Sequence, residues 1–198
     1  MIIYIINNIR KISSVLLIVG IFYGCSLQKF GRGIWFYCCK YKEKNFRSFE
    51  SIIMIIHLAT DHAGLDLKNT IKSYLIDNGY EVNDHGAHEY DPLDDYPDFI
   101  FPCAKAVAKD TNSRGIILGG SGQGEAMAAN RVKGVRAAVF YNGPQEIIKL
   151  SRDHNNANIL SLGARFMTEE EIYTVLDIWL KEPFGGDRHQ RRIDKLDK

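Results

Sequence analysis

From Met54 onward, short apolar runs alternate with longer amphipathic stretches. The short runs, rich in β-branched residues, predict five strands, at residues 55–59, 80–82, 116–118, 136–140 and 159–162. The longer stretches predict helices, at residues 65–78, 98–109, 126–130, 144–152 and 168–180. Strands that alternate with helices favour right-handed βαβ crossovers. We therefore expect an α/β fold in which a five-stranded parallel sheet is covered by helices on both faces, a three-layer α/β/α sandwich.

Residues 1–53 do not follow this pattern. Two basic residues, Arg10 and Lys11, precede an apolar run over residues 12–25, which is similar to a signal peptide or a weak signal anchor but short for a membrane span. Met54 stands directly before the first predicted strand and would make a natural first residue. We interpret residues 1–53 as an N-terminal extension, signal-like or dispensable, and residues 54–198 as the folded domain.

Composition narrows the class of protein. The 198 residues are 45% hydrophobic and 25% charged with a net charge of +1, which is typical of a soluble globular protein and gives no support to a nucleic-acid partner. Beyond the extension Cys103 is the only cysteine, so the sequence predicts neither a disulfide framework nor a zinc site. We expect a cytoplasmic protein, with secretion or membrane association as the alternative if the extension is retained. Cys103 lies in an apolar helical stretch and is predicted to be a core residue.

A glycine-rich loop between the third strand and its helix is the first candidate for chemistry. The loop, Gly119-Gly120-Ser121-Gly122-Gln123-Gly124-Glu125, can present backbone N–H groups to an anion at a helix N-terminus. Its spacing does not fit a nucleotide-binding P-loop, a dinucleotide GxGxxG loop or the GxSxG turn of serine hydrolases. What remains is an anion hole followed by a carboxylate. Glu125 could remove a proton next to a carbonyl, or it could only complement the helix dipole.

Other polar residues follow the ends of strands. Asp61 and His62 come after the first strand and Arg165 after the fifth. Since ligands of parallel α/β sheets bind beyond the carboxyl ends of the strands, we expect these residues to share one site with the glycine loop. Asp61 could instead serve only as a helix N-cap.

Two further groups remain open to two interpretations. His154 and Asn155 could belong to a polar turn that closes a helix, or His154 could serve as an acid–base group or an anion donor. Arg188 and Arg192 are four residues apart, so on a helix they would share one face and could bind a phosphate together with Arg165. They could equally belong to a solvated tail.

Taken together, these segments resemble the ribose-5-phosphate isomerase B family, within the wider group that includes galactose-6-phosphate isomerase subunits. The matching segments run in the family's order from Met54 to the C-terminus, at residues 59–68, 95–99, 119–125, 128–131, 154–158, 162–165 and 188–194. The resemblance implies a Rossmann-like sandwich. It also implies interconversion of D-ribose 5-phosphate and D-ribulose 5-phosphate through an enediolate, with neither metal nor cofactor.

The resemblance also implies roles for residues. Many members use a cysteine base at the start of the glycine loop, where this chain has Gly119-Gly120. The loop here is similar to that of a branch with mycobacterial members, which uses the glutamate, so Glu125 becomes the expected base and His154 the acid that opens the sugar ring. The residues implied for substrate binding are Asp61, His62, Tyr96, Gly120, Ser121, Gly122, Gln123, Gly124, Asn155, Arg165, Arg188 and Arg192.

Members of the family are dimers or tetramers whose sites are shared between subunits. The resemblance therefore implies a homodimer or homotetramer that binds a phosphorylated sugar, with Arg188 and Arg192 acting across an interface. Two alternatives stay open, an isomerase of a six-carbon sugar phosphate such as galactose 6-phosphate or allose 6-phosphate, and a sugar-phosphate-binding module without catalysis. The stretch Tyr141–Pro144 looks slightly longer than in close relatives and could alter the edge of the pocket.

Overall fold

The computed structural model describes residues 26–30, 34–38 and 54–198. The chain divides into two units, Met1–Phe49 and Glu50–Lys198, and each is described by itself. In the first unit β1 (Ser26–Phe30) pairs antiparallel with β2 (Ile34–Cys38), a hairpin that the sequence pattern did not predict. The signal-like run at residues 12–25 lies outside the described residues, and the interpretation of residues 1–53 as an extension stays a prediction.

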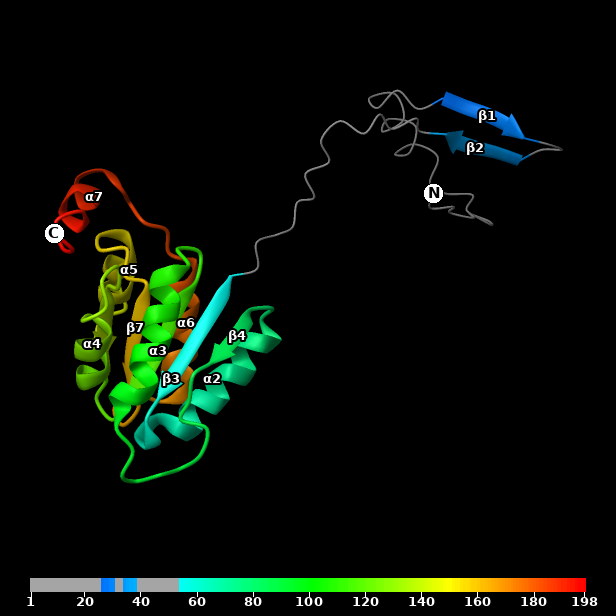
Figure 1. The fold of residues 1–198 in the computed structure, drawn as a ribbon. Helices are drawn as coiled ribbons and strands as arrows, with labels where there is room; N and C mark the ends of the chain where they lie inside the picture. Colours follow the sequence, from blue (N-terminus) through cyan, green and yellow to red (C-terminus); the bar gives the residue numbers. More distant parts are fainter. Residues whose placement is uncertain (1–25, 31–33, 39–53) are drawn as a thin grey trace. The chain divides into compact units, whose positions relative to one another are not determined.

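The second unit is built on one sheet of five parallel strands (Figure 1). The strands stand in the order β4-β3-β5-β7-β6. Their bounds are β3 (Ile55–Thr60), β4 (Glu81–Asp84), β5 (Arg114–Gly119), β6 (Ala137–Phe140) and β7 (Ile159–Gly163). Because every neighbouring pair is parallel, all five carboxyl ends lie along the same edge of the sheet. The predicted five-stranded parallel sheet is confirmed.

Helices cover the sheet on both faces. Their bounds are η1 (His62–Gly64), α2 (Leu65–Asp77), α3 (Tyr96–Lys109), α4 (Gln123–Ala129), α5 (Glu146–Asp153), α6 (Glu169–Lys181) and α7 (Asp187–Ile193). None of the helices in the described part of the chain is long and apolar enough to cross a membrane. The predicted helix at residues 98–109 begins two residues earlier, at Tyr96, because Pro97 fits the first turn of a helix, where no N–H is needed.

The core lies in two layers because successive strand residues face opposite sides of the sheet. Leu118 belongs to the layer under α2, α5 and α6, which also holds the fully buried Trp179. Its neighbour Ile117 belongs to the layer under α3 and α4, together with Cys103. Cys103 is a buried free thiol whose pKa burial raises, as expected for a core residue. The predicted three-layer sandwich is confirmed.

A buried ion pair fixes the chain after β4. Lys68 on α2 is fully buried, and its Nζ donates to Oδ1 of Asp84 at 2.7 Å and to the carbonyl of Ala87 at 2.6 Å. Lys72 donates to Oδ2 of the same carboxylate at 3.0 Å. Burial alone would raise the pKa of Asp84, but the hydrogen bonds from Lys68, the Gly86 N–H and Lys72 lower it to about 2. The start of the loop that leads to α3 is thereby anchored to α2.

Candidate functional site

The glycine loop turns sharply at the carboxyl end of β5 and is fastened to β7. Gly122 has a left-handed φ of 75°, and a Cβ there would lie 3.0 Å from the carbonyl carbon of Leu162. The Ser161 hydroxyl donates to the Gly122 carbonyl at 2.6 Å. The N–H of Ala164 donates to the Gly119 carbonyl at 2.9 Å. These contacts hold the loop against β7 in the position from which α4 begins.

Glu125 lies in the first turn of α4 and is only 5% exposed. Its carboxylate occupies the space beside Gly119 in which a side chain would start, since a Cβ on Gly119 would fall 2.5 Å from Oε2 and closer still to Oε1. Burial raises the pKa of Glu125; its own backbone N–H opposes this shift and the charge of Asp61 adds to it. A buried carboxylate with a raised pKa is a stronger base than an exposed one, which suits proton abstraction.

Asp61 follows β3 and is 8% exposed. Its Oδ1 accepts a hydrogen bond of 3.0 Å from the N–H of Ala63, so it caps η1, as the structural alternative from the sequence predicted. Its negative charge also raises the pKa of Glu125. Asp61 can cap η1 through Oδ1 and still belong to a substrate site, because its carboxylate has a second oxygen.

His62 is held by a residue that sequence reasoning missed. Its Nδ1 lies 2.5 Å from Oδ1 of Asp94, and its backbone N–H donates to the same oxygen at 3.2 Å. The hydrogen bond with Asp94 raises the pKa of His62; burial lowers it, the charges of Asp61 and Asp94 raise it, and Arg165 lowers it. Polar atoms of Asp61, His62 and Asp94 lie within 4.8 Å of one another, so two carboxylates flank the imidazole.

Tyr96 and Arg165 border the glycine loop from two sides. The Tyr96 ring packs so closely on Gly124 that a Cβ there would lie 3.0 Å from it. The Arg165 guanidinium stands over Gly120, where a Cβ would be 3.3 Å away. The carboxyl ends of the strands therefore gather a buried carboxylate, a glycine-rich loop, an imidazole, a phenol and a guanidinium. Chain order predicted that these residues would lie close together, and the structure brings them together; their roles stay a prediction.

A second group of predicted residues lies on α5 and α7. His154 ends α5, and its ring stacks on His189 with centroids 4.3 Å apart and an interplanar angle of 9°. Burial lowers the pKa of His189, and the nearby His154, Arg188 and Arg192 lower it further. Arg188 and Arg192 both lie on α7 and are exposed, as is Asn155. The prediction that the two arginines share a helix is confirmed.

The two groups lie at opposite ends of the strands, the first at the carboxyl ends and the second toward the amino ends. Helix α5 runs back toward the start of β7, and Ile159 there pairs with Gly115 and Ala137, near the starts of the adjoining strands. In Figure 1 α7 accordingly lies at the end of the domain where β3 begins. The four residue steps from Gly115 to Gly119 span about 13 Å of strand. Among residues 54–198 no hydrogen bond, ion pair or ring contact joins His154, Arg188 or Arg192 to the first group.

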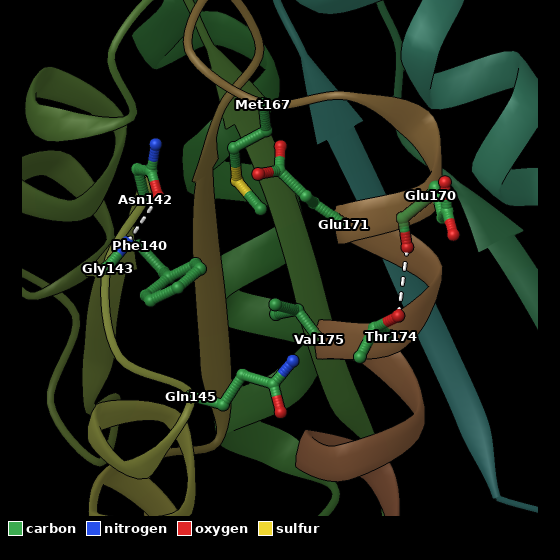
Figure 2. A pocket seen from close by; sticks show the side chains of 9 residues that line it. All are labelled: Phe140, Asn142, Gly143, Gln145, Met167, Glu170, Glu171, Thr174 and Val175. Atoms are coloured by element: carbon green, nitrogen blue, oxygen red, sulfur yellow. Dashed lines mark hydrogen bonds between the residues drawn. The ribbon is translucent and has the colours of Figure 1, made fainter.

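A pocket of about 230 Å³ lies between the chain after β6 and α6 (Figure 2). Its lining residues are Phe140, Asn142, Gly143, Gln145, Met167, Glu170, Glu171, Thr174 and Val175. It contains none of the predicted site residues, although it adjoins the Tyr141–Pro144 stretch noted in the sequence. Glu171 is already used in the capping box with Thr168 at the start of α6. The pocket has no base beside an anion hole, so the carboxyl edge remains the candidate active site.

Comparison with known proteins shows the family to which the chain is similar. The sequence model of the ribose/galactose isomerase family matches residues 56–196. The probable ribose-5-phosphate isomerase B of Mycoplasma genitalium is 45% identical over 142 residues, 71% of this chain and 92% of that protein. The ribose-5-phosphate isomerase B of Mycolicibacterium paratuberculosis is 42% identical over 144 residues, 72% of this chain and 89% of its own. The crystal structure of the Mycoplasma genitalium enzyme with bound ribulose 5-phosphate superposes with a TM-score of 0.69 at 44% identity, covering 72% of this chain and 93% of that one.

Proposed function

Because the chain belongs to the ribose/galactose isomerase family, we propose that it is an aldose–ketose isomerase that interconverts D-ribose 5-phosphate and D-ribulose 5-phosphate. The observation that carries the proposal is the buried Glu125 carboxylate beside the anion-binding loop. A binding protein would have no need to bury a carboxylate with a raised pKa next to that loop.

In the proposed mechanism Glu125 takes the proton from C2 of the open-chain aldose. The electrons of the C–H bond form the C1–C2 double bond, and the carbonyl at C1 becomes an oxyanion. The N–H groups of the loop from Gly120 to Gly124 stabilise this enediolate, as oxyanion holes do in acyl transfer. Protonated Glu125 then returns its proton to C1, while the hydroxyl proton at C2 moves to the oxygen of C1. No metal is needed in any step because the loop and Glu125 supply the charge stabilisation and the base.

Binding the substrate phosphate requires cationic side chains. Within one chain the candidate cations lie at opposite ends of the sheet strands. Arg165 and His62 are available beside the loop, whereas Arg188, Arg192 and the proposed ring-opening acid His154 are at the other edge. We therefore propose that a second copy of the chain completes each site. The surface of α4 and β6 supports this: Met127 is 63% exposed there, and Ala137 and Val139 on the edge strand are only half-buried. Covering such apolar surface favours a dimer.

The assay that tests the function is isomerisation of ribose 5-phosphate by the full chain. Galactose 6-phosphate and allose 6-phosphate are compared at equal concentration, with and without a chelator. We expect preference for the five-carbon substrate and no effect of the chelator. Preference for a six-carbon sugar phosphate would show that the proposed substrate is wrong. Loss of activity with the chelator would refute the metal-free mechanism.

The role of Glu125 is tested by exchange of the C2 proton with solvent. Glu125→Gln keeps the shape but removes the base, so exchange falls at least about a hundredfold. The matched control is Glu146→Gln, which removes an exposed carboxylate from the first turn of α5 and leaves exchange unchanged. Absence of exchange in the wild-type protein would instead favour a binding module.

A shared site also makes activity depend on assembly. Specific activity should fall when the protein is diluted until it dissociates, and the mass measured at the same concentrations should fall with it. Full activity in a monomer would refute the shared site. A cytoplasmic location remains part of the proposal and rests on the cysteine pattern.

A further inference from the structure

Asp94 clamps His62 at two points. A single oxygen, Oδ1, lies 2.5 Å from the ring Nδ1 and 3.2 Å from the backbone N of the same residue. Asp94 stands 32 residues along the chain, in the stretch between β4 and α3, and its side chain is 8% exposed. Two hydrogen bonds to one atom fix the ring relative to its own backbone. The Asp94 carboxylate thus determines how the imidazole is oriented as well as what charge it faces.

The rest of the Asp94 carboxylate is unsatisfied. Its Oδ2 is buried and has no hydrogen-bond partner among the described residues. A buried carboxylate with so few partners is costly unless a cation faces it. His62 is the partner that can supply the charge, because it lies in direct contact and becomes a cation by binding one proton. The pair is therefore most stable as imidazolium and carboxylate.

This arrangement leaves one ring nitrogen for a ligand. With Nδ1–H directed to Asp94, Nε2 is the nitrogen that His62 can present to a substrate, and as imidazolium it carries a proton there. The charged groups that act on the ring are Asp94, Asp61 and Arg165. The Tyr90 ring lies edge-on to it, with centroids 6.0 Å apart. An Nε2–H donor near Arg165 suits a phosphate, since both groups donate to oxygen.

We propose that Asp94 is a positioning residue: it holds the His62 ring so that a cationic Nε2–H faces the substrate phosphate. The assignment rests on the phosphate site of the proposed function and adds to it the group that favours the charged form of His62. The direction of the His62 pKa agrees with this role, because the hydrogen bond that the ring donates to Asp94 is the largest influence and raises the pKa.

The test compares Asp94→Asn with wild type in two measurements that need no turnover. The first is the titration of the His62 ring followed by NMR, and the second is binding of inorganic phosphate between pH 5.5 and 8.5. In Asp94→Asn an amide replaces the carboxylate with nearly the same shape. We expect His62 to titrate at lower pH in the variant and phosphate to bind about tenfold more weakly near pH 7.5. At pH 5.5, where His62 is protonated in both, the difference should shrink.

The matched control is Asp91→Asn, an exposed residue of the same loop whose carboxylate, among the described residues, accepts only from the N–H of Leu93. It should leave both measurements unchanged. An unchanged His62 titration in folded Asp94→Asn overturns the proposal, as does weaker phosphate binding by the same factor at every pH. If Asp94→Asn does not fold, the ¹⁵N shifts of wild-type His62 give the test. A protonated Nδ1 and a titration above the ordinary histidine range support the proposal. A ring that is protonated at Nε2 alone overturns it. Failure of wild type to isomerise ribose 5-phosphate would refute the function without changing these results.

Discussion

Adding one methyl group at Gly119 should disable the proposed base. In Gly119→Ala the new Cβ would stand 2.5 Å from Oε2 of Glu125 and closer to Oε1, whereas carbon and oxygen in ordinary contact are more than about 3.3 Å apart. The carboxylate must therefore move by roughly 1 Å or more. Gly119 ends a regular strand and is not among the glycines with positive φ, so the backbone itself accepts alanine.

A displacement of that size in a general base costs about a hundredfold in rate. At about 1.4 kcal/mol for each tenfold, the transition state loses about 3 kcal/mol. The assay is kcat for ribose 5-phosphate, with the thermal midpoint measured on the same preparation. The control is Gly115→Ala in the same strand, where the new Cβ would lie 2.9 Å from the Ile159 side chain. That change crowds the core and should cost about 1–3 kcal/mol of stability while kcat stays within about threefold.

The double variant tests whether the two substitutions act on the same carboxylate. Gly119→Ala and Glu125→Gln impair the same group, so combining them should cost little more than either alone. Two results would contradict this account. One is a Gly119→Ala protein that folds and keeps near wild-type kcat, and the other is a double variant whose losses multiply.

Three other predictions follow from charge. Burial raises the pKa of Glu125, and the base must be deprotonated to act. The value of kcat/KM should therefore fall as pH falls through a value above the pKa of an ordinary glutamate. A fall in kcat/KM that begins only at or below the ordinary glutamate pKa would contradict this. Arg188→Ala should weaken binding of ribose 5-phosphate far more than binding of free ribose, and calorimetry showing equal effects would remove its phosphate role. Asp84→Asn should cost about 3–5 kcal/mol in urea unfolding because it leaves the buried Lys68 without its counter-charge. In wild type the Asp84 contribution is present above the carboxyl's ordinary pKa and is lost as pH falls toward about 2, the folded-state value.

Most of the fold could be predicted from the order of apolar runs. The five strands and the main helices lie where periodicity placed them, with shifts of a few residues where backbone rules allow either boundary, as at Tyr96. The β1–β2 hairpin was not predicted because neither Ser26–Phe30 nor Ile34–Cys38 alternates regularly between polar and apolar residues.

The part of the candidate site that could be predicted consists of residues placed directly by the ends of parallel strands. Asp61, Glu125 and Arg165 follow parallel strands and so had to meet. Asp94 could not be found this way, because its contact with His62 depends on the path of a long loop. The separation of His154 could have been predicted, since a crossover helix returns the chain to the amino edge of the sheet. The sequence also gave no sign that Gly119 is needed for the room it leaves to a carboxylate.

The placement of the two residue groups at opposite edges of one sheet has a genetic consequence. If each site takes one edge from each of two chains, then Glu125→Gln and Arg188→Ala spoil different halves. A dimer that contains one chain of each kind would carry one site with both defects and one site with none. Random assortment makes about half of the dimers mixed, so about a quarter of wild-type activity would return from two impaired proteins. Two defective alleles of a single gene could then complement each other in one cell.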